Sequence, residues 1–187
     1  MTMNKDFRIE ATILKKRVRE KLKEALEHLP GRISTFAQNR CVLSGGCFAS
    51  LLTGHLVNDW DLWCLDDADI PEMLRLLDSY TEEESDEVTV ENPAYMNQFV
   101  DGKIVTANAV TLKNRVQFIK LTNFATAKKS FDFEHCRVSY IPATDTLYMS
   151  KMQFDSIMNK KLIPTGDTKL VAGSRRMEKF YGRGWSL

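Results

Sequence analysis

The sequence lacks a long apolar run, a paired cysteine motif and a large excess of charge of one sign. Its apolar stretches are far shorter than the roughly 18 residues that span a bilayer, so we expect no membrane partner. The start, residues 1–8, has no apolar signal-peptide core. The four cysteines form no Cys-x-x-Cys pair and no scaffold spacing, which argues against a disulfide-rich secreted fold. These absences predict a protein of the reducing cytoplasm.

Charge and length limit the kind of partner and the number of domains that we expect. The net charge is +1, from 26 Lys and Arg against 25 Asp and Glu, so any nucleic-acid partner would have to meet a local patch. The 187 residues, of which 43% are hydrophobic, are enough for one domain with a core of its own. We expect a single domain over residues 1–187. Its parts would be an N-terminal helix at 1–30, a core carrying the chemistry at 40–140 and a helical tail at 145–187.

The spacing of apolar residues predicts alternating helices and strands. Helices are expected at residues 6–29, 47–52, 69–80, 148–162 and 170–181. Strands are expected at residues 40–43, 59–65, 106–112, 116–121 and 131–140. Pro30-Gly31 ends the first helix, and the acidic run from Thr81 to Glu87 is expected to be a solvated loop. This order is typical of a mixed α/β (α+β) fold, in which helices flank a short mixed sheet.

Two acids stand two residues apart in the strand predicted at 59–65. Residues two apart on a strand point to the same face, so Asp59 and Asp61 project together while Trp60 faces the core. An isolated Asp-x-Asp is more often a solvated strand end. However, two carboxylates this close repel each other unless a cation lies between them, and Mg²⁺ prefers carboxylate and phosphate oxygens. The pair therefore predicts a site for Mg²⁺, with Mn²⁺ as a substitute.

The segment Ser44-Gly45-Gly46 lies shortly before these acids, where a predicted strand passes into a predicted helix. Glycine lets a phosphate approach the backbone, and the amino end of a helix offers free N–H groups. Gly-Gly alone is usually just a turn. Its combination with the acids predicts that one element grips a triphosphate while the next holds the metal.

These residues carry a resemblance to a known family. The run from Ser44-Gly45-Gly46 through Leu51-Leu52 and Gly54 to Asp59-Trp60-Asp61-Leu62 resembles the head signature of the DNA polymerase beta-like nucleotidyltransferase superfamily. It is most similar to the variant in bacterial poly(A) polymerases and CCA-adding enzymes, which carry an Arg-Asp pair where this chain has Ala49-Ser50. We find no counterpart of their separate base-selecting and tRNA-binding domains in this sequence. The chain therefore also looks like the small stand-alone nucleotidyltransferases of bacteriophages.

The resemblance implies a nucleotidyltransferase fold and an activity. The enzyme would transfer a nucleoside monophosphate from a nucleoside triphosphate (NTP) to an acceptor hydroxyl and release pyrophosphate. The acceptor stays open among RNA, a protein and a small molecule. The location would be the cytoplasm, that of the host if the protein is phage-encoded.

The resemblance also implies a third carboxylate, which deprotonates the attacking hydroxyl or completes the metal site. The run at 116–119 has strand character but offers Gln117 where an acid is needed. The run at 131–134 offers two acids between aromatic residues. We favour Asp132 over Glu134 as this third catalytic and metal-binding acid. The alternative is that both acids pair with arginines at the surface.

The tail places Arg176, Lys179 and Arg183 near one helical face. Such a row can clamp a triphosphate or an RNA backbone, although a solvated basic face is the commoner explanation. The predicted nucleotide-binding residues are Ser44, Gly45, Gly46, Arg176 and Lys179. The predicted catalytic and metal-binding residues are Asp59, Asp61 and Asp132.

Two other classes of protein compete with the enzyme. Gln117 and the missing Arg-Asp pair fit a non-catalytic nucleotide- or RNA-binding module of the same fold. A structural or interaction protein, in which the acids only cap a sheet, is the other alternative.

Overall fold

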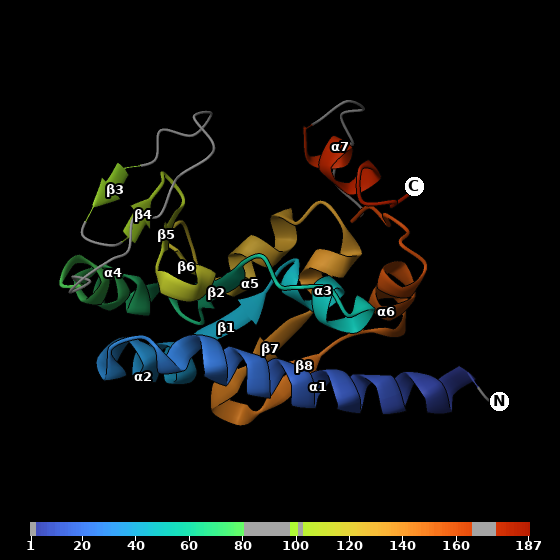
Figure 1. Ribbon diagram of the computed structural model, residues 1–187, viewed down its shortest axis with the longest axis horizontal. Coiled ribbons are helices and arrows are strands. Elements are labelled where there is room, and N and C mark those ends of the chain that lie inside the picture. Colours follow the sequence, from blue (N-terminus) through green and yellow to red (C-terminus); the bar gives the residue numbers. More distant parts are fainter. Residues whose placement is uncertain (1–2, 81–97, 101–102, 166–174) are drawn as a thin grey trace.

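A mixed eight-stranded sheet forms the centre of the protein in a computed structural model that describes residues 3–80, 98–100, 103–165 and 175–187. The strand order is β3-β4-β5-β6-β2-β1-β7-β8 (Figure 1). Strands β2 and β6 pair in parallel, and the other neighbouring pairs are antiparallel. With helices on its flanks, this sheet confirms the predicted fold class. No helix within the described residues is long and apolar enough to cross a membrane.

The strands and helices have the following bounds. The strands are β1 (Cys41–Ser44), β2 (Trp60–Cys64), β3 (Gln98–Val100), β4 (Lys103–Val105), β5 (Ala109–Thr111), β6 (Val116–Ile119), β7 (Ser139–Ile141) and β8 (Thr146–Tyr148). The α-helices are α1 (Met3–Glu27), α2 (Gly31–Arg40), α3 (Cys47–Thr53), α4 (Ile70–Asp78), α5 (Phe124–Ala127), α6 (Lys151–Met158) and α7 (Arg175–Tyr181). The predicted acidic loop at 81–87 and the first part of the predicted last helix, residues 170–174, lie outside the described residues.

Helices α1 and α2 pack against the sheet at β8 and β1, respectively (Figure 1). The apolar stripe of α1 is buried, as its spacing predicts: Leu14, Val18, Leu22, Ala25 and Leu26. The sequence did not predict α2, because Pro30 was interpreted as the end of the helical region. Pro30 lacks an N–H but its carbonyl accepts from Ile33 N at 2.9 Å and Ser34 N at 3.0 Å, so it begins a second helix.

The strand predicted at 131–140 is wrong in its first half. Residues Glu134–Arg137 form a 3₁₀ helix, and the strand begins only at Ser139. Alternation would put successive residues on opposite faces, but Phe133, Glu134 and His135 are all buried. Phe133 forms an isolated bridge with Pro164, which fixes this segment against the chain that follows α6.

Helix α6 begins three residues later than predicted, because a capping box fixes its start. The Ser150 hydroxyl accepts from Gln153 N at 3.2 Å, and Gln153 Oε1 accepts from Ser150 N at 2.8 Å. Tyr148, predicted as the first residue of this helix, is instead the last residue of β8.

A carboxylate in the turn between β7 and β8 holds α1 to the sheet. Asp145 accepts from Lys15 Nζ at 3.1 Å, Arg19 Nη1 at 3.2 Å and Tyr140 Oη at 2.9 Å. The Lys15 hydrogen bond is the largest cause that lowers the pKa of Asp145. Burial, with the Asp145 hydrogen bond second, raises the pKa of Tyr140.

Candidate active site

Strand β2 directs one acid towards the face of the sheet where the candidate site lies. Trp60, Leu62 and Cys64 are buried in the core, whereas Asp61 and Trp63 are half-buried on the other side and line a cavity. The burial of Trp60 agrees with the strand pattern. Asp59 precedes the strand, is exposed and does not line that cavity.

The turn between β1 and α3 packs directly against Asp61. Gly45 has a φ of +119°, and a Cβ added to it would overlap Asp61 Oδ2 and lie 3.4 Å from Asp61 Cγ. Only glycine meets both demands, because it has no side chain and adopts positive φ without strain. A Cβ on Gly46, in contrast, would meet nothing within 4 Å, so the space beside Gly46 is open.

Two neighbours of this turn are held away from solvent. The buried Ser44 hydroxyl donates to Val138 O at 2.8 Å, with Cys136 O at 3.0 Å, and so ties β1 to the segment leading into β7. Burial raises the pKa of the Cys47 thiol, and the charge of Asp61 raises it further. Cys47 therefore stays a neutral thiol at the start of α3.

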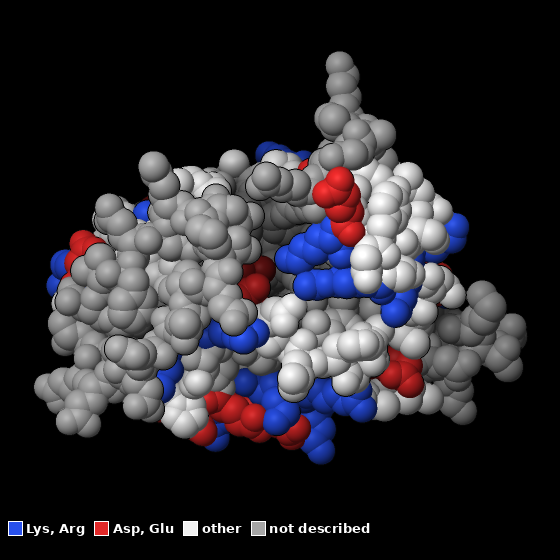
Figure 2. All heavy atoms as spheres, turned by 45° about the horizontal axis from the view of Figure 1, so that its top comes forward, with Lys and Arg blue, Asp and Glu red and all other residues white. Residues whose placement is uncertain are grey.

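A cavity of about 170 Å³ opens beside the turn. Its charged lining residues are Asp61, Asp132, Lys179 and Arg183, and the two glycines of the turn border it. Figure 2 shows acidic and basic side chains bordering the hollow. Two carboxylates and two cations thus share one small space, which suits a ligand carrying both a metal and phosphates.

Asp132 and Glu134, the two candidates for the third acid, have different surroundings. Asp132 lines the cavity with Asp61, whereas Glu134 does not. Glu134 is 9% exposed, and its Oε1 accepts from Arg137 Nη1 at 3.1 Å. Of the two acids, the structure therefore brings Asp132 to the candidate site and commits Glu134 to an ion pair.

The neighbouring strand offers an amide beside Asp61. Gln117 of β6 is the register partner of Asp61 in the parallel pair, and its Nε2 donates to Thr111 Oγ1 at 2.9 Å. The second carboxylate that lines this cavity, Asp132, therefore comes from the segment before the 3₁₀ helix and not from β6.

The basic residues of the tail reach the cavity from two kinds of structure. Lys179 belongs to α7, whereas Arg183 follows the end of that helix. The chain turns back there, because Gly182, Arg183 and Gly184 donate backbone N–H bonds to carbonyls of α7. Arg176 lies in α7, but its side chain is outside the described residues.

The sequence pattern did not predict Phe131 and Phe180 as residues that line the cavity, because aromatic residues at such spacings usually lie in the core.

The acids fit a metal that arrives with its substrate better than a preformed metal site. Within the described residues, no three His, Cys, Asp or Glu side chains are grouped to hold a metal ion. Mg²⁺ commonly takes one or two carboxylates and completes its shell with substrate phosphates and water. Asp61, which lines the cavity, would be one such carboxylate, with Asp132 of the same cavity or Asp59 as the second.

Solved structures define the class of fold. The Thermotoga maritima CCA-adding enzyme complexed with tRNA matches with a TM-score of 0.52 at 13% identity, over 88% of this chain and 41% of that chain. A CCA-adding enzyme with CTP gives a TM-score of 0.44 over 76% and 35%, and an apo form gives 0.47 over 85% and 39%, both at 13% identity. The match to the Thermotoga maritima enzyme shows that the chain has the nucleotidyltransferase fold. The chain spans less than half the length of each of these enzymes.

A family comparison is more specific. Residues 12–160 match the family described as Gabija anti-defense 2 family protein. The chain belongs to this Gabija anti-defense 2 (Gad2) family. No curated protein matches the sequence.

Proposed function

We propose that this protein is a metal-dependent nucleotidyltransferase, which moves a nucleoside monophosphate from an NTP to an acceptor hydroxyl and releases pyrophosphate. One observation carries the proposal: the Asp61 carboxylate lies against the Gly45 turn, in one cavity with Asp132, Lys179 and Arg183. A nucleotidyltransferase needs a metal ligand, a phosphate cradle, a base and countercharges, and each has a candidate here.

Each residue has a separate role in the proposed reaction. Asp61, with Asp59 before the strand, would hold Mg²⁺ or Mn²⁺, which supplies stabilisation of the charge on the transferred phosphoryl group and the leaving pyrophosphate. The open side of Gly46 lets the triphosphate approach the backbone. Lys179 and Arg183 neutralise phosphate oxygens. Asp132 takes the proton of the acceptor hydroxyl.

The countercharges matter more here than the helix amino end. Helix α3 has seven residues, Cys47–Thr53, so its dipole is small compared with that of a long helix. Two side-chain cations at the cavity supply most of the attraction for a triphosphate.

The family name suggests in which cell the proposed reaction would take place and against what it would act. Gabija anti-defense describes an action against a defence, and a protein with that action would be made by a phage and work in the cytoplasm of its host. We propose that the acceptor belongs to that defence. Its chemical kind, RNA, protein or small molecule, decides where the nucleotide is added.

A non-catalytic binding module is the second candidate function. It is favoured by Gln117, which puts an amide in register with Asp61, and by Ala49-Ser50 in place of the Arg-Asp pair of the CCA-adding enzymes. Such a module would bind the NTP without transferring any part of it.

An α-labelled NTP separates the two candidates. The wild type would be incubated with the labelled NTP and Mg²⁺, with and without an extract of cells that carry the Gabija defence, and the Asp61→Asn variant would be the control. The enzyme transfers label to a macromolecule or a new small molecule and releases pyrophosphate, and Asp61→Asn does neither. NTP binding without any release of pyrophosphate, both with and without the extract, would contradict the enzyme and favour the binding module.

A further inference from the structure

We propose that a second, larger cavity next to the candidate active site binds the nucleoside of the donor NTP; this inference rests on the proposed function. The second cavity has a volume of about 540 Å³, against about 170 Å³ for the first. Pockets for small organic ligands commonly measure about 300–1,000 Å³. The smaller cavity therefore suits the triphosphate with its metal, and the larger one has room for a base and a ribose.

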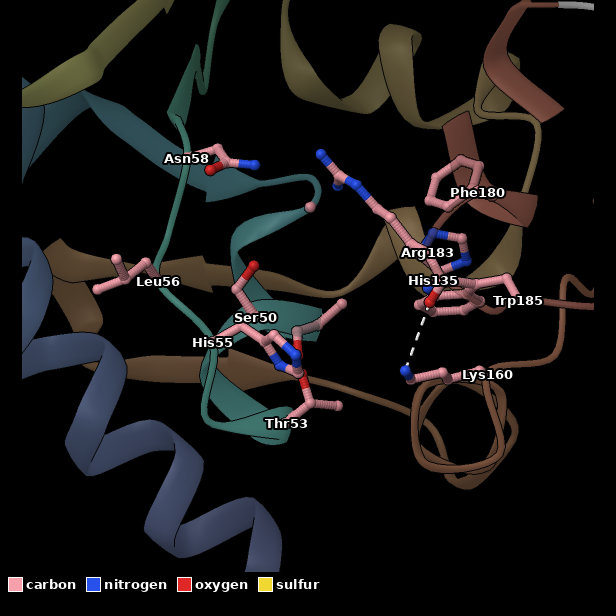
Figure 3. Close-up of a pocket in the computed structure, with 12 residues that line it drawn as sticks. Ser50, Thr53, His55, Leu56, Asn58, His135, Lys160, Phe180, Arg183 and Trp185 are labelled. Carbon is pink, nitrogen blue, oxygen red and sulfur yellow. Dashed lines mark hydrogen bonds between the residues drawn. The ribbon is translucent and has the colours of Figure 1, made fainter. Parts of the chain in front are cut away.

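The two cavities share part of their walls. Gly46, Phe180 and Arg183 line both of them. Figure 3 shows Arg183 reaching over the larger cavity towards Asn58. A single elongated ligand can therefore place its phosphates on one side of Arg183 and its nucleoside on the other.

One wall of the larger cavity carries hydrogen-bonding groups. Ser50 and Thr53 come from α3, and Asn58 comes from the loop that leads into β2. Hydroxyl and amide groups match the sugar hydroxyls and the polar edge of a base. Ala49 and Ser50 have small side chains, which leaves space above α3.

The other wall is aromatic and comes from the C-terminal segment. Phe180 and Trp185 line the cavity with ring centroids 5.5 Å apart, and the buried His135 ring supports both at 4.9 Å and 4.4 Å. Phe180 is half-buried and Trp185 is 9% exposed, and their rings provide flat apolar surface at the cavity against which a base can pack. A polar wall facing an aromatic wall is the arrangement that a nucleoside requires.

The charges of the larger cavity differ from those of the smaller one. Its described lining residues include Lys160 and Arg183 but no Asp or Glu. Lysine and arginine are donors only, and bases present ring nitrogens and carbonyl oxygens as acceptors. The lining therefore favours a ligand rich in acceptors and gives no second carboxylate site for a metal.

Lys160 is held in a backbone conformation that a lysine rarely adopts. Its φ is +48°, in the left-handed region where glycine or asparagine is usual, two residues after the end of α6. Its Nζ approaches Arg183 O at 3.4 Å, and Figure 3 shows the side chain directed into the cavity. Strain of this kind persists at ligand sites, where the side chain is needed although another residue would fit the backbone better.

Calorimetry with Mg²⁺-tripolyphosphate and with each of the four Mg²⁺-NTPs tests the inference. The wild type is expected to bind its preferred NTP about 10- to 100-fold more tightly than tripolyphosphate, because base packing adds to the phosphate contacts. Ser50→Trp, which fills the cavity, should remove this advantage without changing the affinity for tripolyphosphate. Lys160→Gly should reduce the advantage while the melting temperature stays equal or rises, since glycine relieves the positive φ.

Lys161→Met is the matched control. Lys161 also contacts the C-terminal segment, through Nζ to Leu187 O at 2.8 Å, but it does not line the cavity. It should bind both ligands as the wild type does. If Ser50→Trp does not fold, Lys160→Gly carries the test.

Different failures overturn different claims. Lys160→Gly and any folded Ser50→Trp contradict the nucleoside pocket if they still bind NTP more tightly than tripolyphosphate by the wild-type factor. They also contradict it if they lower the affinity for NTP and for tripolyphosphate equally. In both cases the proposed phosphate site is unaffected. If the wild type binds NTP and tripolyphosphate with the same affinity, the inference is also wrong. If the wild type binds neither, the proposed function fails together with the pocket.

Discussion

At the scale of single residues, Asp132 and Glu134 differ although they lie two positions apart. Asp132 borders the cavity that also contains Asp61, whereas Glu134 is paired with Arg137. Position along the chain does not separate them, but their surroundings do. We therefore propose Asp132 for proton transfer and expect Glu134 to act only through its ion pair with Arg137.

The pair of variants Asp132→Asn and Glu134→Gln tests these roles. We expect Asp132→Asn to keep its NTP affinity but to lose turnover by about 10²–10⁴-fold, because proton transfer commonly contributes that factor. Glu134→Gln should keep turnover and melt at a lower temperature, since Arg137 loses a largely buried partner. Pyrophosphate release, calorimetry and thermal unfolding give the three readouts. An inactive Glu134→Gln beside an active Asp132→Asn would reverse the assignment.

At the scale of elements, the turn from β1 into α3 is expected to affect both the stability of the fold and the proposed binding of NTP. Gly45 is a glycine for two structural reasons, its positive φ and its contact with Asp61, while Gly46 has an ordinary helical φ of −69° and open space beside it. Two adjacent glycines therefore respond differently to the same kind of substitution.

Gly45→Ala should lower the free energy of unfolding by about 1–3 kcal/mol and weaken Mg²⁺-NTP binding, because the new Cβ strains the backbone and displaces Asp61. Gly46→Val should leave the fold intact and weaken only the binding, because its side chain occupies the space we assign to phosphate. Circular dichroism, denaturant unfolding and calorimetry separate the two effects. A folded Gly46→Val with unchanged affinity would contradict the phosphate approach, and a Gly45→Ala as stable as wild type would contradict the packing.

The attachment of α1 to the sheet gives a pH dependence. The folded pKa of Asp145 is lowered, so its ion pairs stabilise the protein above the ordinary carboxyl pKa of about 3.9 and are lost as the pH falls through the folded pKa. Asp145→Asn should therefore be less stable at pH 7, and its deficit should shrink below about pH 4. Asparagine also tolerates the left-handed φ of +47°, so the variant isolates the charge. The effect should stay below about 1 kcal/mol, because Lys15, Arg19 and Asp145 are more than a third exposed. A deficit that is the same at pH 3 and pH 7 would contradict this account.

At the scale of the whole molecule, local patterns predicted local structure. The apolar stripe of α1, the alternation around Asp61 and the strands β5 and β6 could be predicted, because each depends on neighbouring residues. The larger cavity could not, since Asn58, His135, Lys160 and Trp185 come from four distant segments and none has a local signal. The 3₁₀ helix at 134–137 was missed as well, because tertiary burial of consecutive residues overrides the alternation that the sequence suggests.

The central claim is that the acids of the Asp-x-Asp pair hold the metal of a bound NTP. Calorimetric titration of the wild type and of the double variant Asp59→Asn/Asp61→Asn with Mg²⁺-NTP tests it most directly, with chelated metal as a blank and thermal unfolding to confirm the fold. We predict that the wild type binds NTP only when Mg²⁺ or Mn²⁺ is present, and that the folded double variant shows no metal-dependent binding. Equal affinity of the two proteins for Mg²⁺-NTP would contradict the account.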